Sequence, residues 1–328
     1  MTESRTRIVT LARHEFRAAA RSKILLIMIG IVVGVTAISV FIASVSYRSQ
    51  LADYEAYRTA AQAGGLDRIA PSPLAALSLL RGALEYLEII GAVIAIALGY
   101  LTVSRERTNR TLPLIRSRPV TSGELATGSL LGAVGVIASL VAVTAAVSVI
   151  CVGTIGNDWI NAGQALQLVL AYIAALIYMT AFYCLGAIAA ANSRVAANGL
   201  MIALGIWLVV VLVLPQIGDT MDADNQLPGG LFKALGLGHD GEVKILTHFT
   251  TYERIRTWTE EASLAKHFER FSFAMADVKE RYRPFGLGWL LGQTRNDIGW
   301  LIAYATASIV GLRRAFRRQP TIPQQGTS

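Results

Sequence analysis

Charged residues that could act together are concentrated in one short stretch of this chain, between Ser104 and Leu125. The stretch holds five arginines and two acids between two long apolar runs. Pro119 ends any helix that precedes it, because proline lacks a backbone N–H and restricts the residue before it. The apolar turn Leu112-Pro113-Leu114-Ile115 lies in the middle. Fixed charges around a small apolar face predict a docking surface.

Two carboxylates form a second candidate site. Glu85 and Glu88 lie one helical turn apart inside an otherwise apolar run. An ionisable side chain within a membrane span is costly and normally faces protein or water, so the pair is a candidate for an intramembrane pathway. The alternative is that both carboxylates lie at headgroup level and pair with Arg81.

Other familiar chemistry has no support in the sequence. No G-x-x-x-x-G-K-[ST] occurs, so the chain has no recognisable P-loop for hydrolysing ATP. Neither H-E-x-x-H nor G-x-S-x-G occurs, and we predict no catalytic, cofactor or metal site in this chain. Asp219, Asp222 and Asp224 lack the glycine and the distal glutamate of a calcium site, which favours a solvated loop. The spacing of His239, His248 and His267 matches no metal-ligand pattern.

Composition places the chain in a membrane. Of its 328 residues, 53% are hydrophobic and 16% charged, whereas soluble domains carry about 25% charged residues. The sequence therefore predicts an all-α polytopic membrane protein, built as a single transmembrane domain over residues 1–328. The net charge of +8 does not indicate nucleic-acid binding, because the arginines cluster at the ends of apolar runs, and that pattern sets membrane topology.

The apolar runs predict six membrane spans, since about 20 apolar residues cross a bilayer. The spans are residues 24–47, 82–103, 126–155, 164–190, 197–217 and 294–312. Before the first, residues 6–22 predict an amphipathic helix in the membrane interface, with Arg13, Arg17 and Arg21 on one face toward anionic membrane lipid. The alternative is a basic flank that only sets topology.

Basic residues also predict the orientation. They crowd the N-terminus, the 104–125 loop, the turn at Arg194 and the C-terminus, and all four fall on one side of a six-span arrangement. Because short basic loops stay in the cytoplasm, both termini are expected on the cytoplasmic side. The protein itself is expected in the plasma membrane of a bacterium.

Residues 218–292 form the largest polar segment and are predicted to be external and α-helical. Apolar side chains recur at steps of four and three between Thr257 and Arg283, which predicts one long amphipathic helix there. It is expected to pack on another external element or on the outer membrane surface.

After the second predicted span, the chain reads R-E-R…T-L…[LI]-x-S-x-P-V-[ST]…E-L. With the basic amphipathic helix before span 1, this pattern resembles the permease subunits of type 2 ABC transporters. The matching residues are Arg105, Glu106, Arg107, Thr111, Leu112, Ile115, Ser117, Pro119, Val120, Thr121, Glu124 and Leu125. Two positions depart from the family pattern, because Arg110 replaces a usual glycine and Gly128 replaces a common lysine.

The resemblance implies a dimer of permeases, homomeric or heteromeric, paired with ABC ATPase subunits that hold the ATP and Mg²⁺. The 104–125 loop would contain the coupling helix, with Arg105, Glu106, Arg107, Thr111, Leu112, Pro119 and Glu124 as its site residues. The expected function is ATP-driven export. Two alternatives remain at this point: mechanical or assembly work with an external partner bound through 218–292, and proton-coupled transport through Glu85 and Glu88.

Overall fold

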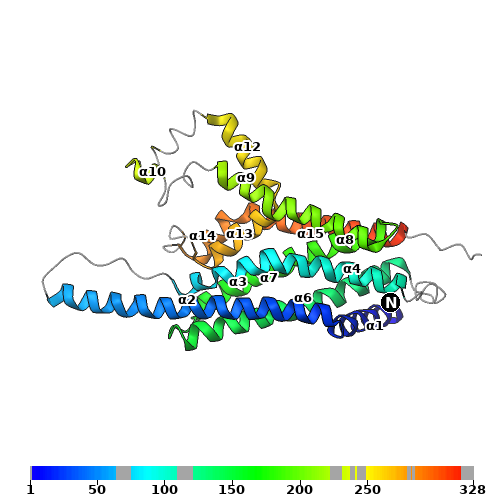
Figure 1. The fold of residues 1–328 in the computed structure, drawn as a ribbon, viewed down its shortest axis with the longest axis horizontal. Coiled ribbons are helices and arrows are strands. Elements are labelled where there is room, and N and C mark those ends of the chain that lie inside the picture. Colours follow the sequence, from blue (N-terminus) through cyan, green and yellow to red (C-terminus); the bar gives the residue numbers. More distant parts are fainter. Residues whose placement is uncertain are drawn as a thin grey trace, which may run out of the picture.

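The protein is described here from a computed structural model, which covers residues 2–63, 75–108, 121–221, 231–236, 241, 249–278, 282 and 285–318. Within these residues the regular structure is helical throughout. Long helices lie side by side along one axis, and α1 (Thr2–Ala20) lies against one end of the bundle (Figure 1).

Three of the long helices are continuous: α2 (Lys23–Ala63), α6 (Ser122–Thr154) and α7 (Ala162–Asn192). Two others are composite. One runs through η1 (Ala76–Leu80), α3 (Arg81–Tyr86), η2 (Leu87–Gly91) and α4 (Ala92–Thr108), and the second through α8 (Ala196–Trp207), η3 (Leu208–Val213) and α9 (Leu214–Met221).

In the described part of the chain, these five long helices are long and apolar enough to cross a membrane. The first five predicted spans each fall on one of them. The sixth falls on α15 (Arg295–Arg318), which has charges at both ends and 15 uncharged residues between Asp297 and Arg313. That stretch is about 23 Å long as a helix, shorter than a hydrocarbon core of about 30 Å, so the sixth span stays a prediction.

The basic segments predicted to share one side of the membrane lie at one end of the bundle. This end, called the basic end below, holds α1, the end of α4, the start of α6 and the last turns of α15 (Figure 1). The opposite end, called the far end, holds α13 (Leu264–Met275) and α14 (Leu287–Gln293). Near this end α12 (Thr250–Glu261) rises away from the side of the bundle (Figure 1).

Helix α7 is the centre of the packing, because α4, α6, α8, α13 and α15 all contact it. Its closest neighbour is α4. A side chain at Gly99 of α4 or at Gly186 of α7 would collide with backbone atoms of the facing helix, so both positions need glycine. Small residues let membrane helices approach in this way, and the contact gains its stability from van der Waals packing.

Two of the described helices contain a π segment, η2 and η3, and in each of these a hydroxyl from outside the helix donates to a backbone carbonyl. Tyr178 Oη of α7 donates to the Glu88 carbonyl over 2.8 Å. Ser263 Oγ, at the start of α13, donates to the Val210 carbonyl over 2.6 Å. A π turn disturbs the regular ladder of backbone hydrogen bonds, and buried carbonyls need partners. The hydroxyls therefore connect the two irregular turns to their neighbours.

The single helix predicted over Thr257–Arg283 is wrong. The structure has two helices here, because Ser263 caps α13 by accepting from Lys266 N over 3.3 Å and also binds η3. The helix was expected to pack on another external element or on the outer membrane surface, and the structure shows instead which helices α13 contacts. The apolar face of α13 packs against α7 and α15, and Phe268 stacks on Tyr178 with ring centroids 4.7 Å apart.

Candidate functional site

At the basic end, α1 lies on a glycine-rich face of α6. A Cβ at Gly132 would lie 2.7 Å from both the Ala12 carbonyl oxygen and Glu15 Cβ, so only glycine fits at this contact. Gly128 lies under Leu11 in the same way. The departure from the family pattern at Gly128 thus has a physical reason in this chain, because a longer side chain would displace α1 from α6.

Glu15 joins α1 to α4. Its Oε1 accepts a hydrogen bond from Thr102 Oγ1 over 2.6 Å and one from Arg105 Nη2 over 3.0 Å. Glu15 is only 8% exposed, so this is a largely buried ion pair. Arg105 also donates from Nε to the Leu101 carbonyl over 3.0 Å. The side chain of Arg105 is therefore held inside the protein by α1.

Glu124 fixes the start of α6. Thr121 Oγ1 accepts from Glu124 N over 3.2 Å, and Glu124 Oε2 accepts from Thr121 N over 2.9 Å, which is a capping box. Arg7 Nη1 of α1 lies 4.0 Å from Glu124 Oε2. The backbone amides at the start of α6 are thus satisfied by a side chain that also faces α1.

The predicted coupling residues fall into two groups. Arg105 and Glu124 are described, and α1 contacts both of them, so it is bonded to the chain on each side of residues 109–120. Glu106 and Arg107 lie in α4, but their side chains are outside the described part. Thr111, Leu112 and Pro119 lie outside the described residues.

Sequence reasoning missed Glu15. The signal was present, because Glu15 is a single acid within the arginine-rich part of α1. Its partner lies 90 residues further along the chain, and only the packing of α1 beside α4 shows which arginine it binds.

At the far end, the two candidate carboxylates have different surroundings. Glu85 Oε1 accepts from Arg81 Nε over 2.7 Å, and this pair is exposed on one helix. Glu88 is buried at 8% exposure within η2. The charged groups that act on it are Glu269, Lys266, Glu85 and Asp219.

Lys266 is a largely buried cation that binds two carboxylates at the far end. Its Nζ donates to Asp219 Oδ1 and to Glu269 Oε2, each over 2.8 Å. Burial acts to lower the pKa of Lys266, but the charges of Glu269 and Asp219 and their hydrogen bonds more than offset it, so the pKa lies above its ordinary value. Lys266 therefore stays protonated and ties α13 to α9.

Of the three histidines outside α1, His267 has two partners in the protein. His267 Nδ1 lies 2.8 Å from Asp297 Oδ1, and Nε2 lies 3.0 Å from the Glu261 carbonyl oxygen. His239 and His248 lie outside the described residues. Among the described residues, no group of three His, Cys, Asp or Glu could hold a metal ion.

In the part of the chain that the structure describes, five helices are long and apolar enough to cross a membrane, which indicates a multi-pass membrane protein. Residues 9–319 match the model of a family described as ABC-2 family transporter protein, and the chain belongs to this family. A comparison with curated proteins found no match. The chain is thus an ABC-2 family transporter permease, and permeases of this family work with an ABC ATPase.

Proposed function

We propose that this chain is the permease of an ATP-driven export complex, and that a separate ATPase subunit docks on residues 104–125. The observation that supports this most directly is the attachment of α1 to both flanks of that loop, to Arg105 through Glu15 and toward Glu124 through Arg7. A force applied to a loop that is anchored at both ends is transmitted to the helices on either side of it.

The proposed roles follow from this anchoring. Arg105 and Glu124 hold the two ends of the loop, because their side chains are bonded within the permease. The residues that would meet the ATPase lie between them, and they are Glu106, Arg107, Thr111, Leu112 and Pro119. The ATP and Mg²⁺ belong to the partner, so the permease itself is a translocation subunit without enzymatic activity.

The docking role is tested with the permease and its ATPase subunit co-purified in lipid nanodiscs. The permease alone should hydrolyse no ATP, and the complex should. Glu106→Ala and Pro119→Gly should lower both assembly and ATP hydrolysis. Glu55→Ala is the control for Glu106→Ala, because Glu55 is an exposed acid of α2 that lies away from the loop. Unchanged hydrolysis and assembly in the two loop variants would refute the docking role.

The proposed arrangement in the membrane is one domain with six spans, α15 included, and with both termini in the cytoplasm of the source cell. A dimer, homomeric or heteromeric, is part of the proposal. The two candidate spans least covered by the rest of the chain are α2 and the α8–α9 helix, so they are the proposed contact. Labelling of single cysteines in whole cells tests the topology, at Ser193 for the cytoplasmic side and at Asn157 for the external side.

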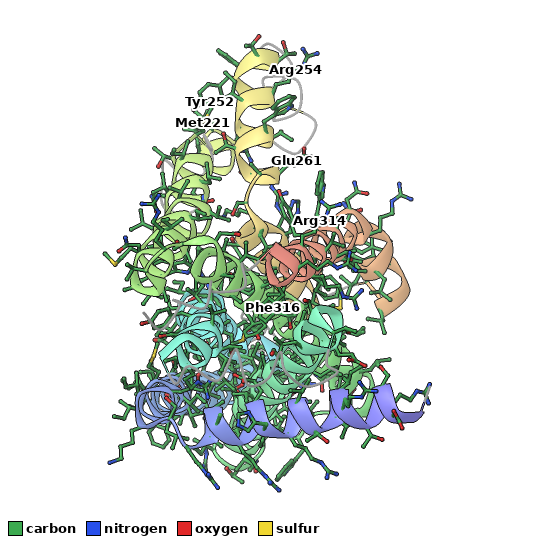
Figure 2. All side chains as sticks on the ribbon, turned by 90° about the vertical axis from the view of Figure 1, so that its right-hand side faces the viewer. Met221, Tyr252, Arg254, Glu261, Arg314 and Phe316 are labelled. Atoms are coloured by element: carbon green, nitrogen blue, oxygen red, sulfur yellow. The ribbon has the colours of Figure 1, made fainter. Side chains whose placement is uncertain are left out.

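A second candidate function is mechanical or assembly work at the far end, and one feature favours it. Helix α12 projects away from the bundle beside α9, with Tyr252 and Arg254 on its outer part (Figure 2). Its side chains Ile255 and Trp258 are 55% and 76% exposed. A photo-crosslinking residue at Trp258 in the full chain should capture an external partner in cells. Capture of lipid alone would count against this function.

A further inference from the structure

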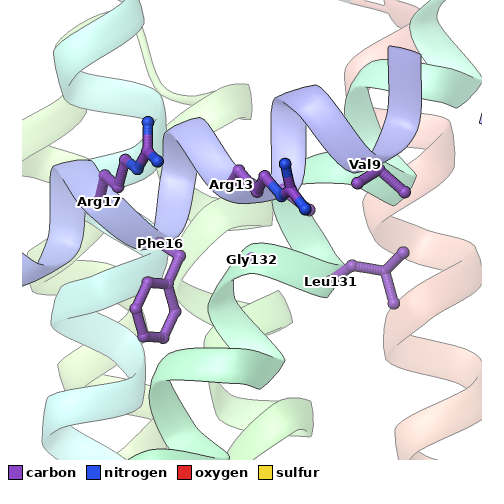
Figure 3. Close-up of a pocket in the computed structure, with 7 residues that line it drawn as sticks. Val9, Arg13, Phe16, Arg17, Leu131 and Gly132 are labelled. Carbon is purple, nitrogen blue, oxygen red and sulfur yellow. The ribbon is translucent and has the colours of Figure 1, made fainter. Parts of the chain in front are cut away.

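A groove lies between α1 and α6 at the basic end, with a volume of about 330 Å³. Its lining is apolar except for two arginines, and consists of Val9, Ala12, Arg13, Phe16, Arg17, Leu131 and Gly132 (Figure 3). The groove belongs to neither the coupling loop nor the buried charges at the far end.

The close contact at Gly132 explains why the groove exists. At Gly132, α1 lies directly against the backbone of α6. The larger side chains on either side of this contact are not covered by the facing helix. Val9 and Leu131 are each 49% exposed, and Phe16 is 39% exposed. Three large apolar side chains therefore line an open surface at the end of the bundle.

Arg13 and Arg17 lie on α1 beside this apolar surface, one helical turn apart (Figure 3). Neither forms an ion pair with a carboxylate among the described residues, whereas Arg7 and Arg105 in the same layer of the protein both do. Two neighbouring guanidinium groups that pair with no carboxylate in the described part of the chain favour an anionic ligand, and phosphate suits their geometry.

The groove lies close to the start of the first candidate span. Helix α1 ends at Ala20 and the apolar helix α2 begins at Lys23, so α1 is expected to lie where the chain enters the membrane. A ligand there must place a negative group on the arginines and an apolar group on Val9, Phe16 and Leu131. A free phosphate would leave the apolar surface uncovered, but a phospholipid supplies both parts in one molecule.

We propose that this groove is a binding site for one anionic phospholipid from the membrane leaflet at the basic end. The phosphate lies between Arg13 and Arg17, and the first part of an acyl chain lies along Val9, Phe16 and Leu131. This is a defined site and differs from diffuse attraction of a basic helix to a charged surface.

The test uses the full chain, purified in detergent that contains equal amounts of phosphatidylglycerol and phosphatidylcholine, with retained lipid measured by native mass spectrometry. The wild type should retain phosphatidylglycerol in preference. The double variant Arg13→Gln, Arg17→Gln should lower the affinity for phosphatidylglycerol about 20- to 30-fold, because each cation near an anionic lipid contributes about a fivefold factor. Its retention of phosphatidylcholine should not change.

Arg5→Gln with Arg21→Gln is the matched control. It removes the same charge from exposed arginines in the N-terminal region that do not line the groove. The control should keep the wild-type preference. An equal loss in the control and the test variant would overturn the proposal in favour of diffuse attraction, and so would wild-type retention in the test variant.

Val9→Trp separates the lipid from a free phosphate, because it fills the apolar surface and keeps both arginines. It should lower retention of phosphatidylglycerol, and excess inorganic phosphate should not displace the lipid from the wild type. Retention unaffected by Val9→Trp, together with displacement by inorganic phosphate, would show a simple anion site and overturn the proposal. An unchanged elution volume and melting temperature of each variant show that the fold is intact.

Discussion

Removal of the Glu15 carboxylate should destabilise the protein strongly. Glu15→Ala leaves the Arg105 guanidinium without its carboxylate partner, although the Arg105 side chain is only 27% exposed. It also leaves the Thr102 hydroxyl without its acceptor in α1. Loss of one partner of a buried ion pair costs about 3–5 kcal/mol. Because Arg105 is not fully buried, we expect about 2–4 kcal/mol.

This free energy corresponds to a lower melting temperature. For a chain of this length, about 1 kcal/mol shifts the midpoint by about 1.5 °C, so Glu15→Ala should melt about 3–6 °C below the wild type. The assay is thermal unfolding of the purified permease in detergent, followed by the loss of helical circular dichroism. The surface pair of Glu3 with Arg7 is the comparison, and Glu3→Gln should shift the midpoint by less than about 1 °C.

The double variant Glu15→Leu, Arg105→Leu distinguishes a loss of packing from a loss of charge balance. Replacing both partners with apolar residues removes the uncompensated charge, so stability should return to within about 1 kcal/mol of the wild type. A double variant as unstable as Glu15→Ala would refute the reasoning, because the loss would then come from packing. A Glu15→Ala variant as stable as the wild type would show that the pair contributes nothing.

Three further outcomes are expected from the same unfolding measurement. Gly132→Leu should destabilise by about 1–3 kcal/mol or detach α1. Gly30→Ala should stay within about 0.5 kcal/mol of the wild type, because nothing lies within 4 Å of the added Cβ. Ser263→Ala should cost about 1–3 kcal/mol, because it removes a cap from α13 and the donor to the carbonyl in η3. Lys266→Met should cost about 1–3 kcal/mol near neutral pH. The pKa of Lys266 is raised in the folded protein, so Lys266 contributes its full stabilisation at every pH below its unfolded pKa. The difference in free energy of unfolding between the wild type and Lys266→Met should disappear only as the pH rises through the raised pKa.

The long helices were predictable because apolar composition alone requires them. Residues 126–155 were predicted as a span and α6 runs from Ser122 to Thr154, with a difference at its start that the capping box explains. The capping box itself is a local signal, since Thr121 and Glu124 are three residues apart. Features that depend on neighbours close in sequence were therefore visible in the chain.

Features that depend on packing were not visible. Nothing near Ser263 in the sequence shows that its hydroxyl reaches a carbonyl 53 residues earlier, so the break between α12 and α13 was missed. The two π segments have ordinary apolar sequences. Arg105 matched a docking motif, but its guanidinium points to Glu15 inside the protein, and the direction of a side chain follows from the helix beside it.

The attachment of α1 to both flanks of the 109–120 loop has a kinematic consequence. If α4 and α6 moved apart at the basic end, either the hydrogen bonds of Glu15 to α4 or the contact of α1 with Gly132 of α6 would break. A force applied between the end of α4 and the start of α6 is therefore expected to move α1, α4 and α6 together, while the close contact of α4 with α7 restrains the middle of α4.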